Sequence, residues 1–151
     1  TRQKPDEKKT VFRKPRGKVL VMEDEDRVRV GIGRMLGHLG FQVAYAKNGS
    51  EAIHLYKQAR HTERPFDVVI MDLSVPGGLG GRETLLNLQE LDKDVCAIVS
   101  SGHFNDPVLK NYREHGFSGI IPKPYRIEDL DRVLQKVLRG REASEANSRV
   151  G

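Results

Sequence analysis

The stretch Val68–Gly81 reads VVIMDLSVPGGLGG: an apolar run ends at one aspartate, Asp72, and a glycine-rich loop follows. A run that is apolar on both faces is typical of a central parallel strand, which helices cover on both sides. Glycine lets the backbone of the following loop approach a ligand closely. The stretch therefore predicts a buried strand that delivers a carboxylate beside a loop suited to close contact.

Strands and helices alternate on both sides of this stretch. We expect strands at 18–23, 41–46, 66–72, 94–102 and 117–124, and helices at 24–40, 48–60, 82–91, 105–116 and 126–138. Such alternation across short loops predicts one α/β domain whose parallel sheet is covered by helices on both faces. In sheets of this kind, ligands bind at the carboxyl ends of the strands.

Three local features qualify this assignment. The helix at 24–40 contains Gly31, Gly33 and Gly37, each of which weakens a helix by roughly 1 kcal/mol relative to alanine. Ser50 is a possible N-cap for the helix at 48–60. From Gly140 onward the sequence turns polar, and we expect a frayed end.

The positive charge is concentrated at the N-terminus. The chain has 151 residues and a formal net charge of +5, and residues 1–17 carry seven basic against two acidic residues, a net +5. We therefore expect a basic flexible linker or tail at 1–17, a neutral domain at 18–139 and a polar C-terminal tail at 140–151. A charged tail of this kind favours a solvated linker over nucleic-acid binding, so we expect no nucleic-acid contact by the domain.

The single cysteine, Cys96, excludes an internal disulfide and fits a reducing compartment. It lies in an apolar run, which favours a buried, inert thiol over a catalytic one. No apolar run reaches the roughly 18 residues of a membrane span, and no signal-peptide pattern is present. We expect a cytoplasmic domain without membrane contact of its own, and, because the chain starts at Thr1, a fragment of a longer protein.

Polar side chains gather where the predicted strands end. Each has an ordinary explanation by itself, such as a helix cap, a turn former or a surface lysine. Because the carboxyl ends of parallel strands share one edge of the sheet, they are instead expected to converge. The set is Glu23 and Asp24 after the first strand, Asp72 at the third, Ser100 and Ser101 at the fourth, and Lys123 at the fifth.

The chemistry of this set points to phosphoryl transfer. Clustered carboxylates repel one another unless a cation joins them, and Mg²⁺ suits oxygen ligands. Asp72 could then act as a nucleophile that forms an acyl phosphate. Lys123 would pair with a phosphoryl oxygen, and Ser101 would donate a hydrogen bond to it.

Four motifs, VLVMEDE, VVIMDLSVPGG, AIVSSG and IPKPY, together resemble the receiver domain of two-component response regulators over about residues 18–139. The resemblance implies a flavodoxin-like (CheY-like) doubly wound sheet of five parallel strands, order 2-1-3-4-5, with helices on both faces. It also implies Mg²⁺ as the cofactor.

Carried over by position, Asp72 resembles the phosphoacceptor and a metal ligand. Asp24 resembles a direct metal ligand, Glu23 a ligand through water, and the backbone carbonyl of Ser74 the third protein ligand. The remaining roles fall to Lys123 as the phosphate-binding lysine and Ser101 as the switch hydroxyl, with Ser100 a weaker candidate. The family also implies a cis peptide bond between Lys123 and Pro124.

The chain departs from the family pattern at three places. Glu23 stands where the family more often has aspartate, and its longer arm can still act through water. Ile120 stands where the family has its switch aromatic, which argues against that rotamer mechanism here. The loop after Pro76 is one residue longer than the common form, and with SSGHFNDP it resembles receivers of hybrid sensor histidine kinases.

The resemblance implies a receiver that takes a phosphoryl group from a phosphohistidine of a histidine kinase or histidine phosphotransfer domain. Such a domain catalyses only its own phosphorylation and dephosphorylation, and the added charge alters the face formed by residues 105–138. The expected parent is a hybrid histidine kinase, which could carry a membrane anchor. A weak dimer is a further expectation.

Other functions remain open. The receiver could stand alone, belong to a DNA-binding regulator, or be a pseudo-receiver that binds partners without phosphate. The complete acidic, hydroxyl and lysine set argues against the pseudo-receiver. A haloacid-dehalogenase-like phosphatase would need aspartate at Ser74, and a flavin binder would need a phosphate-cradling loop where Glu23 and Asp24 make the chain acidic.

Overall fold

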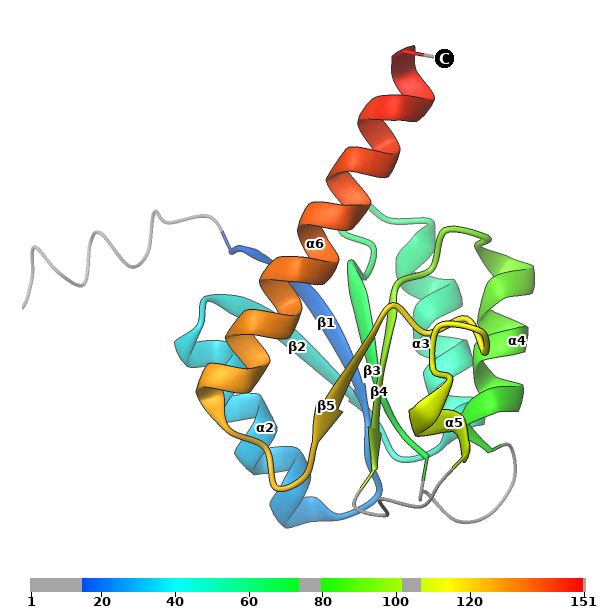
Figure 1. Cartoon of the computed structure of the whole chain (residues 1–151). Coiled ribbons are helices and arrows are strands. Elements are labelled where there is room, and N and C mark those ends of the chain that lie inside the picture. Colours follow the sequence, from blue (N-terminus) through cyan, green and yellow to red (C-terminus); the bar gives the residue numbers. More distant parts are fainter. Residues whose placement is uncertain (1–14, 74–79, 102–106, 151) are drawn as a thin grey trace, which may run out of the picture.

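The computed structural model describes residues 15–73, 80–101 and 107–150, and the side chains of 101, 107 and 142–150 lie outside this description. Its centre is a five-stranded parallel sheet in the order β2-β1-β3-β4-β5 (Figure 1). The strands are β1 (Gly17–Met22), β2 (Phe41–Ala46), β3 (Val68–Asp72), β4 (Ala97–Ser101) and β5 (Gly119–Pro122). The predicted strand order is confirmed.

In the part of the chain that the structure describes, five helices cover the two faces of the sheet. They are α2 (Asp26–His38), α3 (Gly49–Arg60), α4 (Gly81–Leu91), α5 (Pro107–Lys110) and α6 (Ile127–Val150). Figure 1 shows α2 and α6 on one face and α3, α4 and α5 on the other. Helices on both faces are what the sequence predicted for a doubly wound sheet.

The strand β3 lies between the two hydrophobic layers of the domain, and its side chains contribute to both. Val68 and Ile70 belong to the cluster with the apolar residues of α2 and α6, and Val69 and Met71 belong to the cluster with those of α3 and α4. Every residue of β3 is buried, including Asp72 at its end. Successive side chains of a strand point to opposite faces, so the continuous apolar run is what a strand between two helical layers requires.

The expected helix at 105–116 is much shorter in the structure. The helix α5 ends at Lys110, and the residues after it form turns whose backbone hydrogen bonds span different separations, such as Gly116 to Arg113 and Phe117 to Tyr112. Gly116 adopts φ of 96°, which favours glycine over residues with a Cβ. The turns place Phe117 in the core, where it is 2% exposed.

The helix α6, in contrast, runs past its expected end at 138 to Val150, so the expected fraying from Gly140 is wrong for the backbone. Arg141 donates a hydrogen bond to the backbone oxygen of Asp67, and its Nη1 lies 3.8 Å from Asp67 Oδ1. Asp67 directly precedes β3. This contact fixes the helix beside the edge of the sheet where the strands begin.

Two smaller expectations also change. The N-cap of α3 is Asn48, whose side chain accepts a hydrogen bond from the Glu51 amide at 2.9 Å, and Ser50 lies inside the helix. Gly33 has a packing role in α2, because a Cβ there would lie 1.9 Å from the Tyr45 hydroxyl oxygen. The buried position of Cys96 is confirmed.

Within the described residues, no helix combines the length and apolar character that crossing a bilayer requires.

Candidate functional site

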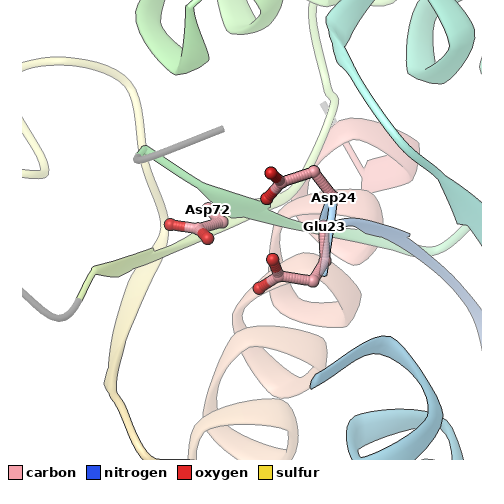
Figure 2. A group of neighbouring side chains, drawn as sticks. All are labelled: Glu23, Asp24 and Asp72. Atoms are coloured by element: carbon pink, nitrogen blue, oxygen red, sulfur yellow. The ribbon is translucent and has the colours of Figure 1, made fainter. Parts of the chain in front are cut away.

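Three carboxylates meet at the carboxyl edge of the sheet. Glu23 and Asp24 follow β1, and Asp72 ends β3, which is paired with β1 so that Met22 and Met71 lie abreast. One carboxylate oxygen from each of the three lies within 4.8 Å of the others. Figure 2 shows the side chains of Glu23 and Asp24 turned toward Asp72. Glu23 and Asp72 are buried, and Asp24 is exposed.

Lys123 reaches this cluster from the chain that follows β5. Its Nζ donates to Glu23 Oε1 at 2.7 Å and to Asp72 Oδ2 at 2.7 Å. The strand β4 lies between β3 and β5, so the lysine side chain crosses one strand to reach Asp72. The expected cis peptide bond between Lys123 and Pro124 is confirmed.

Burial and charge shift the ionisation of these groups. Burial raises the pKa of Glu23, which the hydrogen bond from Lys123 and the Glu25 amide only partly offset, and the nearby Asp72 charge adds to the rise. Burial lowers the pKa of Lys123, but the hydrogen bonds to Asp72 and Glu23 outweigh it and raise the pKa above its ordinary value. Lys123 is therefore a permanent cation within the cluster.

The donor set fits a hard divalent cation. Counted formally, the three carboxylates and the one ammonium give the cluster a charge of −2. All the side-chain donors are carboxylate oxygens, which Mg²⁺ prefers, and the exposed Asp24 leaves one side of the cluster open to water ligands. A divalent ion would balance the charge that Lys123 leaves uncompensated.

The strand β4 places Ser100 directly beside Asp72, as its partner in the β3–β4 ladder. The Ser100 side chain is buried, and its Oγ lies 2.6 Å from the Tyr125 hydroxyl oxygen. Ser101 ends β4 opposite Pro122. The side chain of Ser101 and the whole of Ser74 lie outside the described residues, so the roles expected for them remain predictions.

Tyr125 was not among the predicted site residues. Its position two residues after Lys123, in the motif IPKPY, was the only signal in the sequence. Burial raises the pKa of Tyr125 to about 12, although the hydrogen bond with Ser100 and the Lys123 charge act in the opposite direction. The hydroxyl is therefore protonated at neutral pH and available for hydrogen bonding.

Arg29 connects the start of α2 to the carboxyl edge of the sheet by hydrogen bonds. Arg29 donates to the backbone oxygen of Glu23 at 3.0 Å and to that of Asp24 at 3.3 Å, and its guanidinium also contacts the Asp26 carboxylate. Beside these residues, a groove of about 450 Å³ runs between α2 and the segment 123–125, with Val28, Ile32 and Met35 on its apolar side.

Known proteins that resemble this chain match it over most of its length. Residues 19–135 match the family model of the response regulator receiver domain. The response regulator GacA of Pseudomonas aeruginosa is 32% identical over 125 residues, which are 82% of this chain and 56% of GacA. The sensor kinase CckA of Brucella abortus is 30% identical over 120 residues, 80% of this chain and 12% of CckA.

The fold has close counterparts among solved structures. The chemotaxis protein CheY4 of Vibrio cholerae superposes with a TM-score of 0.69 at 27% sequence identity, covering 81% of this chain and 98% of CheY4. The flavodoxin-like, CheY-like fold inferred from the sequence is thereby confirmed. The chain spans only about half of GacA and a small part of CckA.

Proposed function

Because the chain belongs to the response regulator receiver family of two-component systems, we propose that Asp72 accepts a phosphoryl group from a phosphohistidine, with Mg²⁺ as cofactor. The observation that carries this proposal is the meeting of Glu23, Asp24, Asp72 and Lys123 at one edge of the sheet. Receiver domains act with histidine kinases or phosphotransferases, so the proposed donor belongs to one of these classes.

In the proposed transfer, a carboxylate oxygen of Asp72 attacks phosphorus. The P–O bond forms as the P–N bond to the histidine breaks, and the imidazole leaves with the electron pair and takes up a proton. The Lys123 ammonium already contacts Asp72 Oδ2. It would move with little displacement onto a phosphoryl oxygen and stabilise the added negative charge.

Glu23 and Asp24, together with Asp72, would hold Mg²⁺, Glu23 through a water molecule. The ion would neutralise charge that develops on the phosphoryl oxygens. Their burial differs in a way that suits these roles: Glu23 is 1% exposed and held by Lys123 and the Glu25 amide, whereas Asp24 faces solvent. We retain Ser74 as the backbone ligand and Ser101 as the switch hydroxyl.

The phosphorylated state would alter the face formed by α5, β5 and α6, because Lys123 and Tyr125 connect β5 and α6 directly to the site. The apolar groove between α2 and segment 123–125 adjoins the same carboxylates. The proposed phosphodonor would have this surface available beside Lys123, which lines the groove and contacts Asp72.

The proposal is tested by incubation with acetyl phosphate and Mg²⁺ followed by intact-mass measurement. Wild type should gain one phosphate, Asp72→Asn should gain none, and Asp94→Asn, a control at an exposed aspartate away from the site, should behave as wild type. A persistent gain in Asp72→Asn would overturn the assignment of Asp72. No gain in the wild type would favour a pseudo-receiver.

The parent protein is proposed to be a cytoplasmic-facing hybrid histidine kinase. The similarity to the sensor kinase CckA supports this context, and the similarity to GacA supports the alternative of a separate response regulator. Sequencing the coding region on both sides would decide: a histidine kinase core supports the hybrid, and a DNA-binding domain supports the regulator.

A further inference from the structure

Ser100 and Tyr125 form a hydroxyl pair that the proposed phosphoryl chemistry does not use. Their oxygens lie 2.6 Å apart, Ser100 is fully buried, and Tyr125 is partly buried. The Tyr125 ring also packs against the apolar layer shared by α2 and α6. A short hydrogen bond between two neutral hydroxyls at this depth fixes both side chains.

The pair closes a ring of contacts around Asp72. Asp72 lies beside Ser100 in the β3–β4 ladder. The Ser100 hydroxyl holds Tyr125, Tyr125 is two residues from Lys123, and the Lys123 ammonium returns to Asp72 at 2.7 Å. Tyr125 attaches the segment after β5 to β4, and the ammonium contacts Asp72. The Lys123 side chain is therefore held both at its backbone and at its ammonium.

The ring of Tyr125 lies near the same ammonium. Lys123 Nζ is 5.9 Å from the ring centroid, at the outer limit of a cation–π contact. Phenylalanine at this position would keep the ring and its packing and remove only the hydroxyl. The link between Tyr125 and Ser100 can therefore be separated by mutation from the ring contact.

We propose that Tyr125 is a positioning residue: its hydroxyl, held by Ser100, keeps the Lys123 ammonium between Glu23 and Asp72. The kinetic consequence rests on the proposed phosphorylation of Asp72, whereas the placement of the ammonium does not. Loss of the hydroxyl link lets segment 123–125 move away from β4, and the ammonium then spends more time outside the carboxylate cluster.

The test uses Tyr125→Phe, Ser100→Ala and the double variant in the full chain. The reactivity of Lys123 toward an amine-acylating reagent is measured by peptide mass spectrometry, without Mg²⁺ or phosphodonor, with Lys93 and Lys136 as internal references. Both single variants should raise the labelling rate of Lys123 by about threefold or more, within the range seen for coupled neighbours. They should also slow phosphorylation by acetyl phosphate by a similar factor.

A matched control is Tyr56→Phe. The Tyr56 hydroxyl donates to Asp92 Oδ2 at 2.8 Å, so the same substitution removes a tyrosine hydrogen bond, here to a carboxylate, between α3 and the residue after α4. It should lower the melting temperature and leave Lys123 labelling unchanged. This control separates general destabilisation from displacement of the lysine.

The double variant distinguishes positioning from a merely structural bond. Removing both hydroxyls leaves no unpaired partner, so stability should recover relative to Ser100→Ala. Under the proposal, Lys123 labelling and the slowed phosphorylation do not recover. Recovery of all three readouts, or unchanged labelling in every variant, would overturn the positioning role.

Failure of the proposed function has a different signature. If wild type takes no phosphate while the variants still raise Lys123 labelling, Asp72 phosphorylation is wrong and the positioning of Lys123 stands. If wild type is phosphorylated and the variants match it in both labelling and rate, the positioning inference is wrong.

Discussion

Lys123 Nζ lies 2.7 Å from Asp72 Oδ2, and the Asp72 side chain is only 3% exposed. The same ammonium is equally close to Glu23, whose side chain is 1% exposed. Two buried carboxylates thus share one cation, which the segment after β5 supplies. Removing one member of a buried ion pair leaves an uncompensated charge, which costs far more than the loss of a surface pair.

We predict that Lys123→Met lowers the free energy of unfolding by about 3 kcal/mol at pH 7, because both carboxylates lose their cation. Burial already raises the pKa of Glu23, and loss of the ammonium raises it further. A carboxyl with a raised pKa is destabilising above its unfolded pKa of 4.5, so the deficit relative to wild type should shrink as pH falls toward 5.

Urea unfolding of both proteins at pH 7 and pH 5 measures this difference. Lys136→Met, at an exposed position of α6, is the control and should change stability little. An equal deficit at the two pH values would contradict the explanation.

Asp24→Asn should weaken Mg²⁺ binding by about tenfold or more, since even outer-shell partners of metal ligands commonly contribute that much. Because Asp24 is exposed, the variant should keep nearly the stability of wild type. Calorimetric Mg²⁺ titration of the variant against Glu25→Gln, an adjacent exposed carboxylate outside the cluster, gives the comparison. Equal affinities in the two variants would remove Asp24 from the metal site.

The glycines of α2 should respond differently to alanine. A Cβ at Gly37 meets nothing within 4 Å, so Gly37→Ala should raise the free energy of unfolding by about 1 kcal/mol through helix propensity alone. Gly33→Ala should gain less, because Tyr45 must move aside. Urea unfolding measures both changes in the free energy of unfolding. In a Tyr45→Ala background, the deficit of Gly33→Ala relative to Gly37→Ala should disappear. Persistence of the deficit there would locate its cause elsewhere.

Tyr125 should ionise late in an alkaline titration. Burial raises its pKa to about 12 from 10.0, so phenolate absorbance should show a step near pH 12 that Tyr125→Phe lacks. The neutral hydroxyl is favoured in the folded state, so its contribution to stability is complete below pH 10 and is lost as pH rises from 10 through 12. A difference spectrum without a late step would contradict the buried hydroxyl pair.

The sequence predicted the parts of the site that lie at strand ends. Glu23, Asp24, Asp72 and Lys123 converge because parallel strands share one carboxyl edge, and this needs only the strand order. The contact between Tyr125 and Ser100 could not be anticipated in the same way. It depends on how the chain after β5 folds back onto β4, and the spacing of apolar residues in the sequence does not predict this.

Helix ends were harder to predict than strand positions. The pattern of residues 105–116 is compatible with a helix, but burial of Phe117 and the positive φ of Gly116 favour turns after Lys110. For α6, the polar residues after Gly140 suggested an end, whereas Arg141 finds a tertiary partner in Asp67. In both places tertiary contacts overrode local preference.

The course of α6 has a practical consequence for experiments on signalling. The helix begins after the carboxyl edge of the sheet, passes Asp67 and, over its 24 residues, spans about 36 Å. Figure 1 shows its last turns extending beyond the body of the domain, on the side opposite the carboxyl ends of β1 and β3. A fluorophore or affinity tag joined after Val150 would therefore stand clear of Asp72, at the far end of the helix that follows the segment carrying Lys123.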